Sequence, residues 1–191
     1  MTGLHPSDLI LVSILLPLAA AFLIPVFHRS PNLREGVTII AAVALWITVL
    51  DLVPHILDGA RPTALNFEIV PGLGLAFQVE PLGMLFGLVA STLWIVNSIY
   101  SIGYMRGHHE PRQTTFFVCF AVAIASTIGL AFSRNLFTLF IFYEILTLST
   151  YPLVAHKANE EARSGARIYL MLLLGTSMVL LLPAIIITLN V

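Results

Sequence analysis

The stretch LFTLFIFYEILTLSTYPLVA, residues 136–155, decides the fold of this chain. A membrane-spanning helix needs about 20 mostly apolar residues, and this stretch meets that length with a single carboxylic acid, Glu144. Only helices and closed barrels satisfy all of their own backbone groups in lipid. The stretch therefore predicts a helix that crosses a membrane.

Similar stretches lie on both sides of it, at about residues 9–27, 37–57, 82–104, 115–133 and 168–189. Residues 58–81 interrupt the series with several Gly and Pro residues, and their runs 65–70 and 75–79 are typical of strands. We predict an all-α polytopic membrane protein with six transmembrane helices and a short extramembrane hairpin between helices 2 and 3. Residues 1–191 are expected to form a single membrane domain.

Composition excludes several classes of protein. Of the 191 residues 58% are apolar and only 10% are charged, whereas soluble proteins have about 25% charged residues. A formal net charge of -1 gives no basic excess for a nucleic acid. The lone cysteine, Cys119, excludes a disulfide framework and a cysteine-based zinc cluster.

The basic residues predict how the chain is oriented. Arg61 and Arg134 lie in connections on one side of the membrane, and the other seven of the nine lie on the opposite side: Arg29, Arg34, Arg106, Arg112, Lys157, Arg163 and Arg167. Cytoplasmic connections carry the excess of Lys and Arg. We therefore expect a multi-pass protein of the cell (cytoplasmic) membrane, with both termini and the hairpin outside.

Glu144 is the main candidate for a functional residue. It follows Asn135 by nine residues, which at about 1.5 Å per residue places it roughly 13–14 Å into the membrane. An ionisable group near the centre of the bilayer is costly and is a functional site by default. Loss of water disfavours the charged form of a carboxylate, so we expect Glu144 to load and release a proton. The alternative is a structural carboxyl group that is hydrogen-bonded to a neighbouring helix.

Four further residues are candidates for a proton relay. Thr147 and Tyr151 follow Glu144 at i+3 and i+7 and so share its helix face. His156 and Lys157 close the same helix. Two interpretations of this closing pair stay open, a basic helix end that complements the helix dipole and a relay in which the histidine titrates near neutral pH.

The sequence predicts no cofactor site, no metal site and no catalytic residue. The run His108-His109-Glu110 is expected to be a solvated loop, because no further ligands follow at zinc spacing. Motifs of intramembrane enzymes, such as His-Glu-x-x-His and Gly-x-Ser-x-Gly, are absent from the sequence. The pair Gly83 and Gly87 is a small-xxx-small pattern and predicts close helix packing.

Four motifs carry a family resemblance: EPLGMLF (80–86), YSIGYM (100–105), NLFTLFIFYE (135–144) and LSTYPLV (148–154). They resemble the antiporter-like membrane subunits. That family includes the D subunit of Mrp-type cation/proton antiporters and the large membrane subunits of respiratory complex I and of membrane-bound hydrogenases. The D-type pattern is the most similar, over about residues 80–183.

The resemblance implies more than the residues themselves do. Members of the family have about fourteen helices, built around two inverted repeats. The carboxylate that matches Glu144 transfers protons there, and it pairs with a lysine on the seventh helix. Since the six predicted spans contain no Lys or Arg, we expect the chain to be the N-terminal portion of such a subunit. Other membrane subunits would supply the later helices and the lysine partner of Glu144.

Two functions follow as hypotheses. The first is a proton/cation-translocating subunit of a multisubunit antiporter or respiratory-type membrane complex, with Glu144 as its protonatable group. The alternative is a non-conducting structural or assembly subunit of such a complex. The parent complex, whether antiporter-like, NADH-quinone oxidoreductase-like or hydrogenase-like, stays open. The chain fits a piece of a split subunit, a truncated product, or a small subunit that keeps the front of the fold.

Overall fold

The structure is a computed structural model that describes residues 3–70, 73–156 and 160–189. Its elements follow in the order α1 (Pro6–Val26), α2 (Pro31–Leu57), β1 (Thr63–Val70), β2 (Leu73–Gln78), α3 (Pro81–Gly107), α4 (Gln113–Ala131), α5 (Leu136–Val154) and α6 (Glu160–Leu189). Six helices in the described residues are long and apolar enough to cross a membrane. The predicted polytopic all-α class is therefore confirmed, as is the hairpin after the second helix.

Local sequence explains where the helices begin. Pro6, Pro31 and Pro81 stand in the first turns of α1, α2 and α3, where a missing N–H costs nothing. Asn135 caps α5, because its side chain accepts a hydrogen bond from the Thr138 backbone N–H at 2.7 Å. The largest differences from the predicted starts are at α2, which begins at residue 31, and α6, which begins at residue 160, because their first turns are polar.

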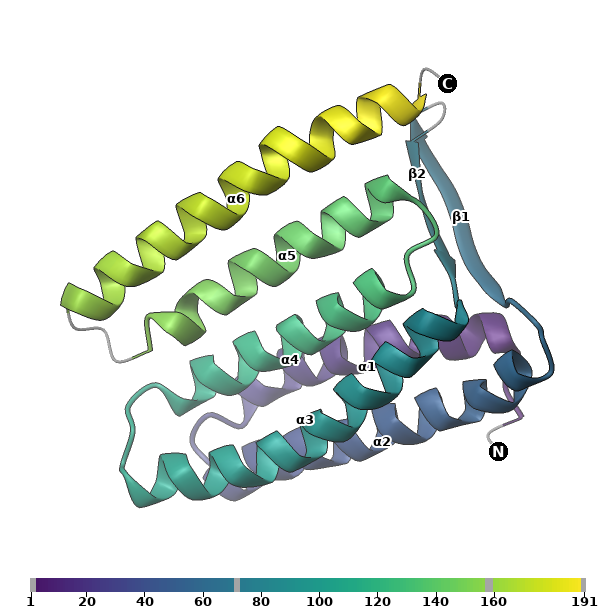
Figure 1. Cartoon of the computed structure of the whole chain (residues 1–191). Helices are drawn as coiled ribbons and strands as arrows, with labels where there is room; N and C mark the ends of the chain where they lie inside the picture. The colour runs from purple at the N-terminus through teal and green to yellow at the C-terminus, as the bar shows by residue number, and fades with distance from the viewer. Residues whose placement is uncertain (1–2, 71–72, 157–159, 190–191) are drawn as a thin grey trace.

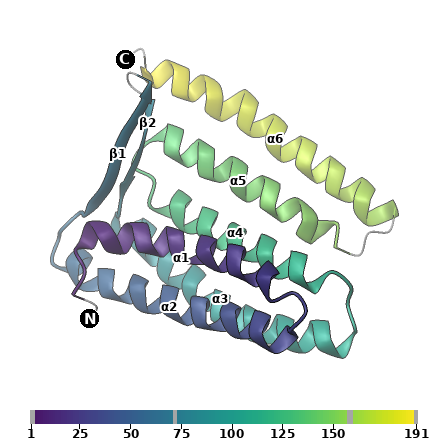
Figure 2. The ribbon, with the colours of Figure 1, turned by 180° about the vertical axis from the view of Figure 1, so that it is seen from behind.

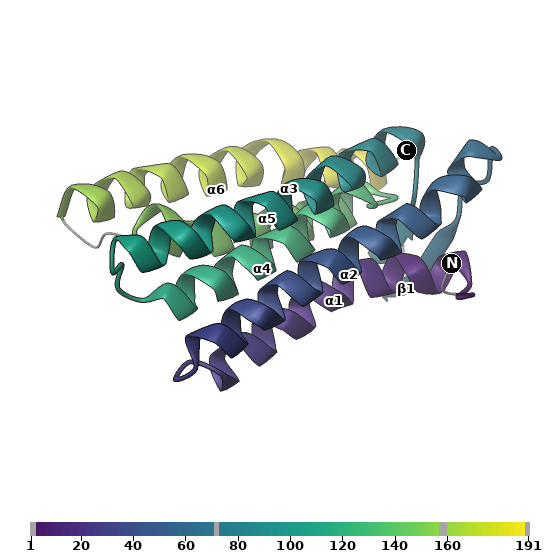
Figure 3. The ribbon, with the colours of Figure 1, turned by 90° about the horizontal axis from the view of Figure 1, so that it is seen from below.

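Helices α1 to α4 form a bundle, and the last two helices are added to one side of it. The core of the bundle includes Ile14 of α1, Leu45 and Val49 of α2, Trp94 of α3 and Phe117 of α4, all buried. α5 packs on α4 and α6 packs on α5, so α6 lies at one edge of the molecule (Figures 1 and 2). Seen from below, α1 and α2 form the opposite edge (Figure 3). Many apolar side chains of α6 are consequently exposed.

Two glycines let neighbouring helices approach closely. A Cβ atom at Gly83 of α3 would overlap the carbonyl oxygen of Ala131 at the end of α4. A Cβ atom at Gly129 of α4 would overlap the ring of Phe142 on α5. Larger residues cannot stand at either position unless the helices move apart, so the packing predicted from Gly83 is present.

The hairpin is joined to the connection between α4 and α5. Its strands β1 and β2 pair antiparallel, from Thr63 opposite Gln78 to Val70 opposite Leu73. The Gln78 N–H donates to the carbonyl of Phe132 at 2.8 Å, and the Arg134 N–H donates to the carbonyl of Ala76 at 2.9 Å. The hairpin therefore runs across the helix ends as a bound element (Figure 1).

The molecule has two distinct ends. α1 begins and α6 ends beside the hairpin (Figures 1 and 2), and we call this the hairpin end. The basic end lies opposite and contains the connections α1–α2 and α3–α4, the end of α5 and the start of α6. The basic end holds the connections to which the sequence assigns seven of the nine Lys and Arg residues. It is therefore the end that the sequence predicts to face the cytoplasm.

Candidate functional site

Glu144 lies in the middle of α5, as its position in the sequence predicts. It is the ninth of the 19 residues of the helix, which is flanked by α4 and α6 (Figure 1). The residue is half-buried. Its carboxylate turns toward α6, where it meets Ser177.

Ser177 is the polar partner of Glu144. The serine is 3% exposed, and its hydroxyl is within hydrogen-bonding distance of Oε1 of Glu144 and, at 3.0 Å, of the carbonyl oxygen of Leu174. A hydroxyl has one proton to donate. When Glu144 is ionised, Ser177 can donate to it. When Glu144 is protonated, the acid can donate to the serine, which then donates to Leu174. The pair is thus able to hold both protonation states without losing its hydrogen bond.

The second oxygen of Glu144 has no such partner. Oε2 is buried and accepts no hydrogen bond from the residues that the structure describes. Nor does any Arg or His among those residues form an ion pair with Glu144. A buried polar atom without a partner is costly, so this oxygen marks a position at which a donor or a cation would be stabilising.

Thr147 and Thr150 follow Glu144 along α5. Thr147 is 3% exposed and lies one turn closer to the basic end. Beyond it, the Thr150 hydroxyl lies 3.3 Å from the phenol oxygen of Tyr169 on α6. The α5–α6 interface therefore carries polar side chains from Glu144 toward the basic end. Sequence reasoning did not include Ser177 and Tyr169, because pairing between helices is not visible in one helix.

Tyr151 and His156 meet at the basic end. Both line a pocket of about 330 Å³ together with Arg112, Arg163 and Arg167. Nε2 of His156 is buried without a hydrogen-bond partner among the described residues and lies 3.9 Å from a carboxylate oxygen of Glu110. The structure thus brings two of the predicted relay residues together. Lys157, the fourth, lies outside the described residues.

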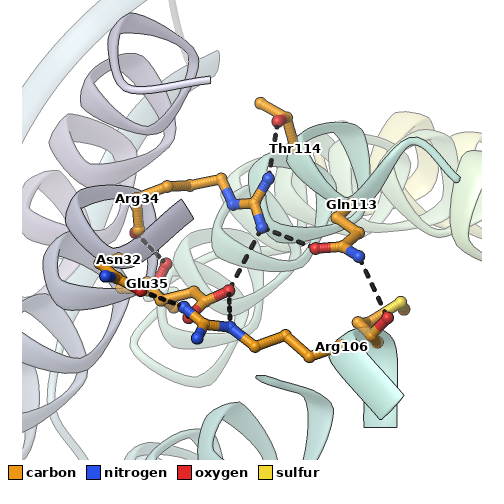
Figure 4. Close-up of polar contacts among 8 residues, drawn as sticks. Asn32, Arg34, Glu35, Arg106, Gln113 and Thr114 are labelled. Carbon is orange, nitrogen blue, oxygen red and sulfur yellow. Dashed lines mark hydrogen bonds and ion pairs between the residues drawn. The ribbon is translucent and has the colours of Figure 1, made fainter. Parts of the chain in front are cut away.

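A second buried carboxylate lies at the basic end, and sequence reasoning missed it. Glu35, the fifth residue of α2, is 5% exposed. Its Oε1 accepts from Nε of Arg106 at 3.1 Å and from Nη2 of Arg34 at 3.3 Å, while its Oε2 accepts from Nη2 of Arg106 at 2.5 Å (Figure 4). Asn32 also accepts from Arg106, at 2.5 Å. We call these residues, with Gln113 and Thr114, the Glu35 network.

Arg34 connects the Glu35 network to α4. It is 4% exposed, and its guanidinium donates to the side-chain oxygens of Gln113 at 2.7 Å and Thr114 at 3.2 Å (Figure 4). The same group lies over the ring of Phe117, 5.4 Å from its centroid. One network therefore joins the ends of α2, α3 and α4.

The position of Arg34 corrects one expectation from the sequence. Hydropathy predicts it in a connection outside the spans, whereas the structure places it inside α2 and buries it. The difference arises because a charged first turn lowers the average hydropathy of the window. A signal was present nevertheless, since Glu35 and Arg106 are opposite charges at helix ends on the same predicted side of the membrane.

Comparisons with known proteins agree with the motifs. Residues 133–191, which include Glu144 and Ser177, match the family described as NADH:quinone oxidoreductase/Mrp antiporter, transmembrane region. The A1 subunit of a Na⁺/H⁺ antiporter of Staphylococcus aureus is 24% identical over 160 residues. The predicted resemblance to the antiporter-like membrane subunits is confirmed.

A second relative shows how far the resemblance extends. The A/B subunit of a probable K⁺/H⁺ antiporter of Rhizobium meliloti (strain 1021) is 28% identical over 173 residues. The two matches cover 81% and 87% of this chain but only 20% and 17% of the relatives. The chain thus spans about a fifth of the length of these curated relatives. Both relatives are A-type subunits by name, so the likeness to the D subunit stays a prediction.

A solved structure supports the fold. A chain of the membrane-bound sulfane sulfur reductase, an archaeal respiratory membrane complex, superposes with a TM-score of 0.74 at 21% identity. The match covers 86% of this chain and 34% of that one. At this level of identity the likeness concerns the arrangement of the helices.

Proposed function

We propose that this chain is part of a proton/cation-translocating subunit of a multisubunit membrane complex and that Glu144 is its protonatable group. The observation that carries the proposal is the environment of Glu144 between α5 and α6. Its Oε1 is paired with a hydroxyl that can donate or accept, and its Oε2 is buried without a partner among the described residues. Such a carboxylate can exchange a proton without a large rearrangement of its surroundings.

The basic end provides the proposed access for protons. Thr147 lies one helical turn beyond Glu144, and Tyr151 and His156 lie at the pocket that opens there. A chain of hydroxyl groups and an imidazole can pass protons, because each group both donates and accepts. In this proposal Lys157 ends the same path.

The proposal also includes a partner. A cation near Oε2 would favour the ionised form of Glu144, and withdrawal of the cation would favour proton uptake. We propose that another membrane subunit, or a segment outside these 191 residues, supplies a lysine and the remaining helices. The exposed apolar surface of α6, which includes Met171 and Val179, offers a face on which such helices can pack.

Replacement of Glu144 tests the function. The chain is expressed with its partner subunits, and proton movement driven by a Na⁺ or K⁺ gradient is measured in inverted membrane vesicles. Glu144→Gln is expected to lower the flux roughly 100-fold, since a positioned proton-transfer group contributes about that much. Glu68→Gln, an exposed site on the hairpin, is the matched control and should leave flux unchanged. Unchanged flux in Glu144→Gln would refute the proposal.

A structural or assembly role is the second candidate. It is favoured by the hydrogen bond from Ser177, which is able to hold Glu144 as a fixed bridge between α5 and α6. This candidate expects Glu144→Gln to conduct normally and deletion of the chain to prevent assembly of the complex. Blue-native electrophoresis of the deletion strain, together with the flux assay, separates the two functions.

A further inference from the structure

The arginines at the basic end fall into two groups with different partners. Arg34 and Arg106 both form ion pairs with Glu35 in the Glu35 network. Arg112, Arg163 and Arg167 line the pocket beside α5 and form no ion pair with any carboxylate whose side chain the structure describes. Three arginines, one at the N-cap of α4 and two in the first turns of α6, therefore line one pocket without a described ion-pair partner.

The same pocket presents further hydrogen-bonding groups. Thr115, Tyr151 and His156, whose side chains carry hydroxyl groups and an imidazole, also line it. The His156 side chain is 14% exposed, and its Nε2 has no hydrogen-bond partner among the described residues. Glu110 lies 3.9 Å from this nitrogen, and its single negative charge leaves the pocket with a net positive charge. The guanidinium of Arg112 already donates to the backbone carbonyl of His156, at 2.6 Å, which fixes it at the rim.

We propose that this pocket binds the phosphate group of an anionic lipid headgroup. Guanidinium groups match phosphate oxygens in charge and in geometry. The pocket lies at the ends of the membrane helices, at the level where headgroups lie, and basic pockets between helices on the cytoplasmic side take anionic headgroups.

The surface next to the pocket favours a lipid over free phosphate. Val154 precedes the pocket residues Ala155 and His156 on α5 and is 47% exposed. Ile168 follows Arg167 on α6 and is 58% exposed. The polar pocket therefore continues into apolar side chains of both helices, as an amphiphile with a charged head and acyl chains requires.

Native mass spectrometry of the purified 191-residue chain tests the proposal. The chain is titrated in detergent with phosphatidylglycerol and, separately, with phosphatidylcholine. We expect one phosphatidylglycerol to be retained in preference to phosphatidylcholine. Arg167→Gln should weaken its binding roughly tenfold, the usual effect of losing one charge-assisted hydrogen bond. Arg29→Gln removes an exposed charge at the same end but outside the pocket, and it should leave binding unchanged.

Three outcomes would overturn the proposal. Equal weakening in Arg29→Gln and Arg167→Gln would indicate general surface charge. Equal retention of the two lipids would exclude recognition of an anionic headgroup. If millimolar inorganic phosphate displaces phosphatidylglycerol and binds to the chain as tightly as the lipid does, the pocket is a site for free phosphate. If Arg167→Gln loses its helical circular dichroism spectrum, Thr115→Ala replaces it, and a few-fold weaker binding of phosphatidylglycerol is then the expected result.

Discussion

Glu35 and Glu144 are two carboxylates in the same helical protein with opposite surroundings. Glu35 lies at the basic end in contact with two guanidinium groups. Glu144 lies in the middle of α5 and is paired with one serine hydroxyl. The first is compensated within the chain by residues of α2 and α3, whereas no described residue supplies a cation to the second.

The difference lies in the charge of the neighbours, because Glu35 has cationic partners and the described partner of Glu144 is neutral. Glu35 is bound by the guanidinium groups of Arg34 and Arg106, and these contacts tie helix ends together as a structural ion pair does. An acid whose partner is a hydroxyl keeps a hydrogen bond in either state. Burial of a carboxylate is therefore not enough to indicate proton transfer, because the charge of its neighbours decides which role it can fill.

The largest expected effect on stability comes from Glu35. Glu35→Gln leaves Arg34 and Arg106 without their counter-charge, and removing one partner of a buried ion pair costs about 3 kcal/mol. Glu144→Gln keeps its contact with Ser177 and should change stability by about 1 kcal/mol or less. Thermal unfolding of both variants in the same detergent, followed by circular dichroism, measures the difference. Similar losses of stability in the two variants would mean that Glu35 and Glu144 do not differ in their structural role.

Ser177 tests whether the hydroxyl partner of Glu144 matters for proton movement. Ser177→Ala removes the hydroxyl that serves both protonation states of Glu144, so flux in vesicles is expected to fall roughly tenfold. The adjacent Thr176 is the matched control, because among the described residues its exposed hydroxyl bonds to the carbonyls of Leu172 and Leu173 in its own helix. Thr176→Ala should leave flux unchanged. Equal flux in the two variants would show that Glu144 works without this hydroxyl.

The smallest effect is expected at Tyr169. Tyr169→Phe removes one 3.3 Å hydrogen bond between α5 and α6, which corresponds to about 0.5 kcal/mol of stability. The value is low because the bond is long and the ring keeps its packing. A chemical denaturation curve of this variant tests how much polar pairing holds α6 in place. A loss as large as that of Glu35→Gln would mean that α6 depends on polar contacts as strongly as the bundle does.

The sequence predicted the elements better than the contacts between them. Six helices and the hairpin follow from apolar length and from turn residues, and both are local properties. The mid-helix position of Glu144 follows from counting along one helix. The Glu35 network joins residues 32–35 to residues 106–114, and no local pattern states that these helix ends meet. The same reason hid Ser177, which lies 33 positions from its partner.

The bound hairpin has a mechanical consequence for α5. Backbone hydrogen bonds to β2 hold the chain just before this helix, and the amide of Asn135 adds one to the carbonyl of Gly74 at 2.9 Å. A rigid helix that is held at its N-terminal end moves most at its C-terminal end. Any tilt of α5 would therefore displace Tyr151 far more than Leu136, and the largest displacement would occur beside the pocket that Arg112, Arg163 and Arg167 line.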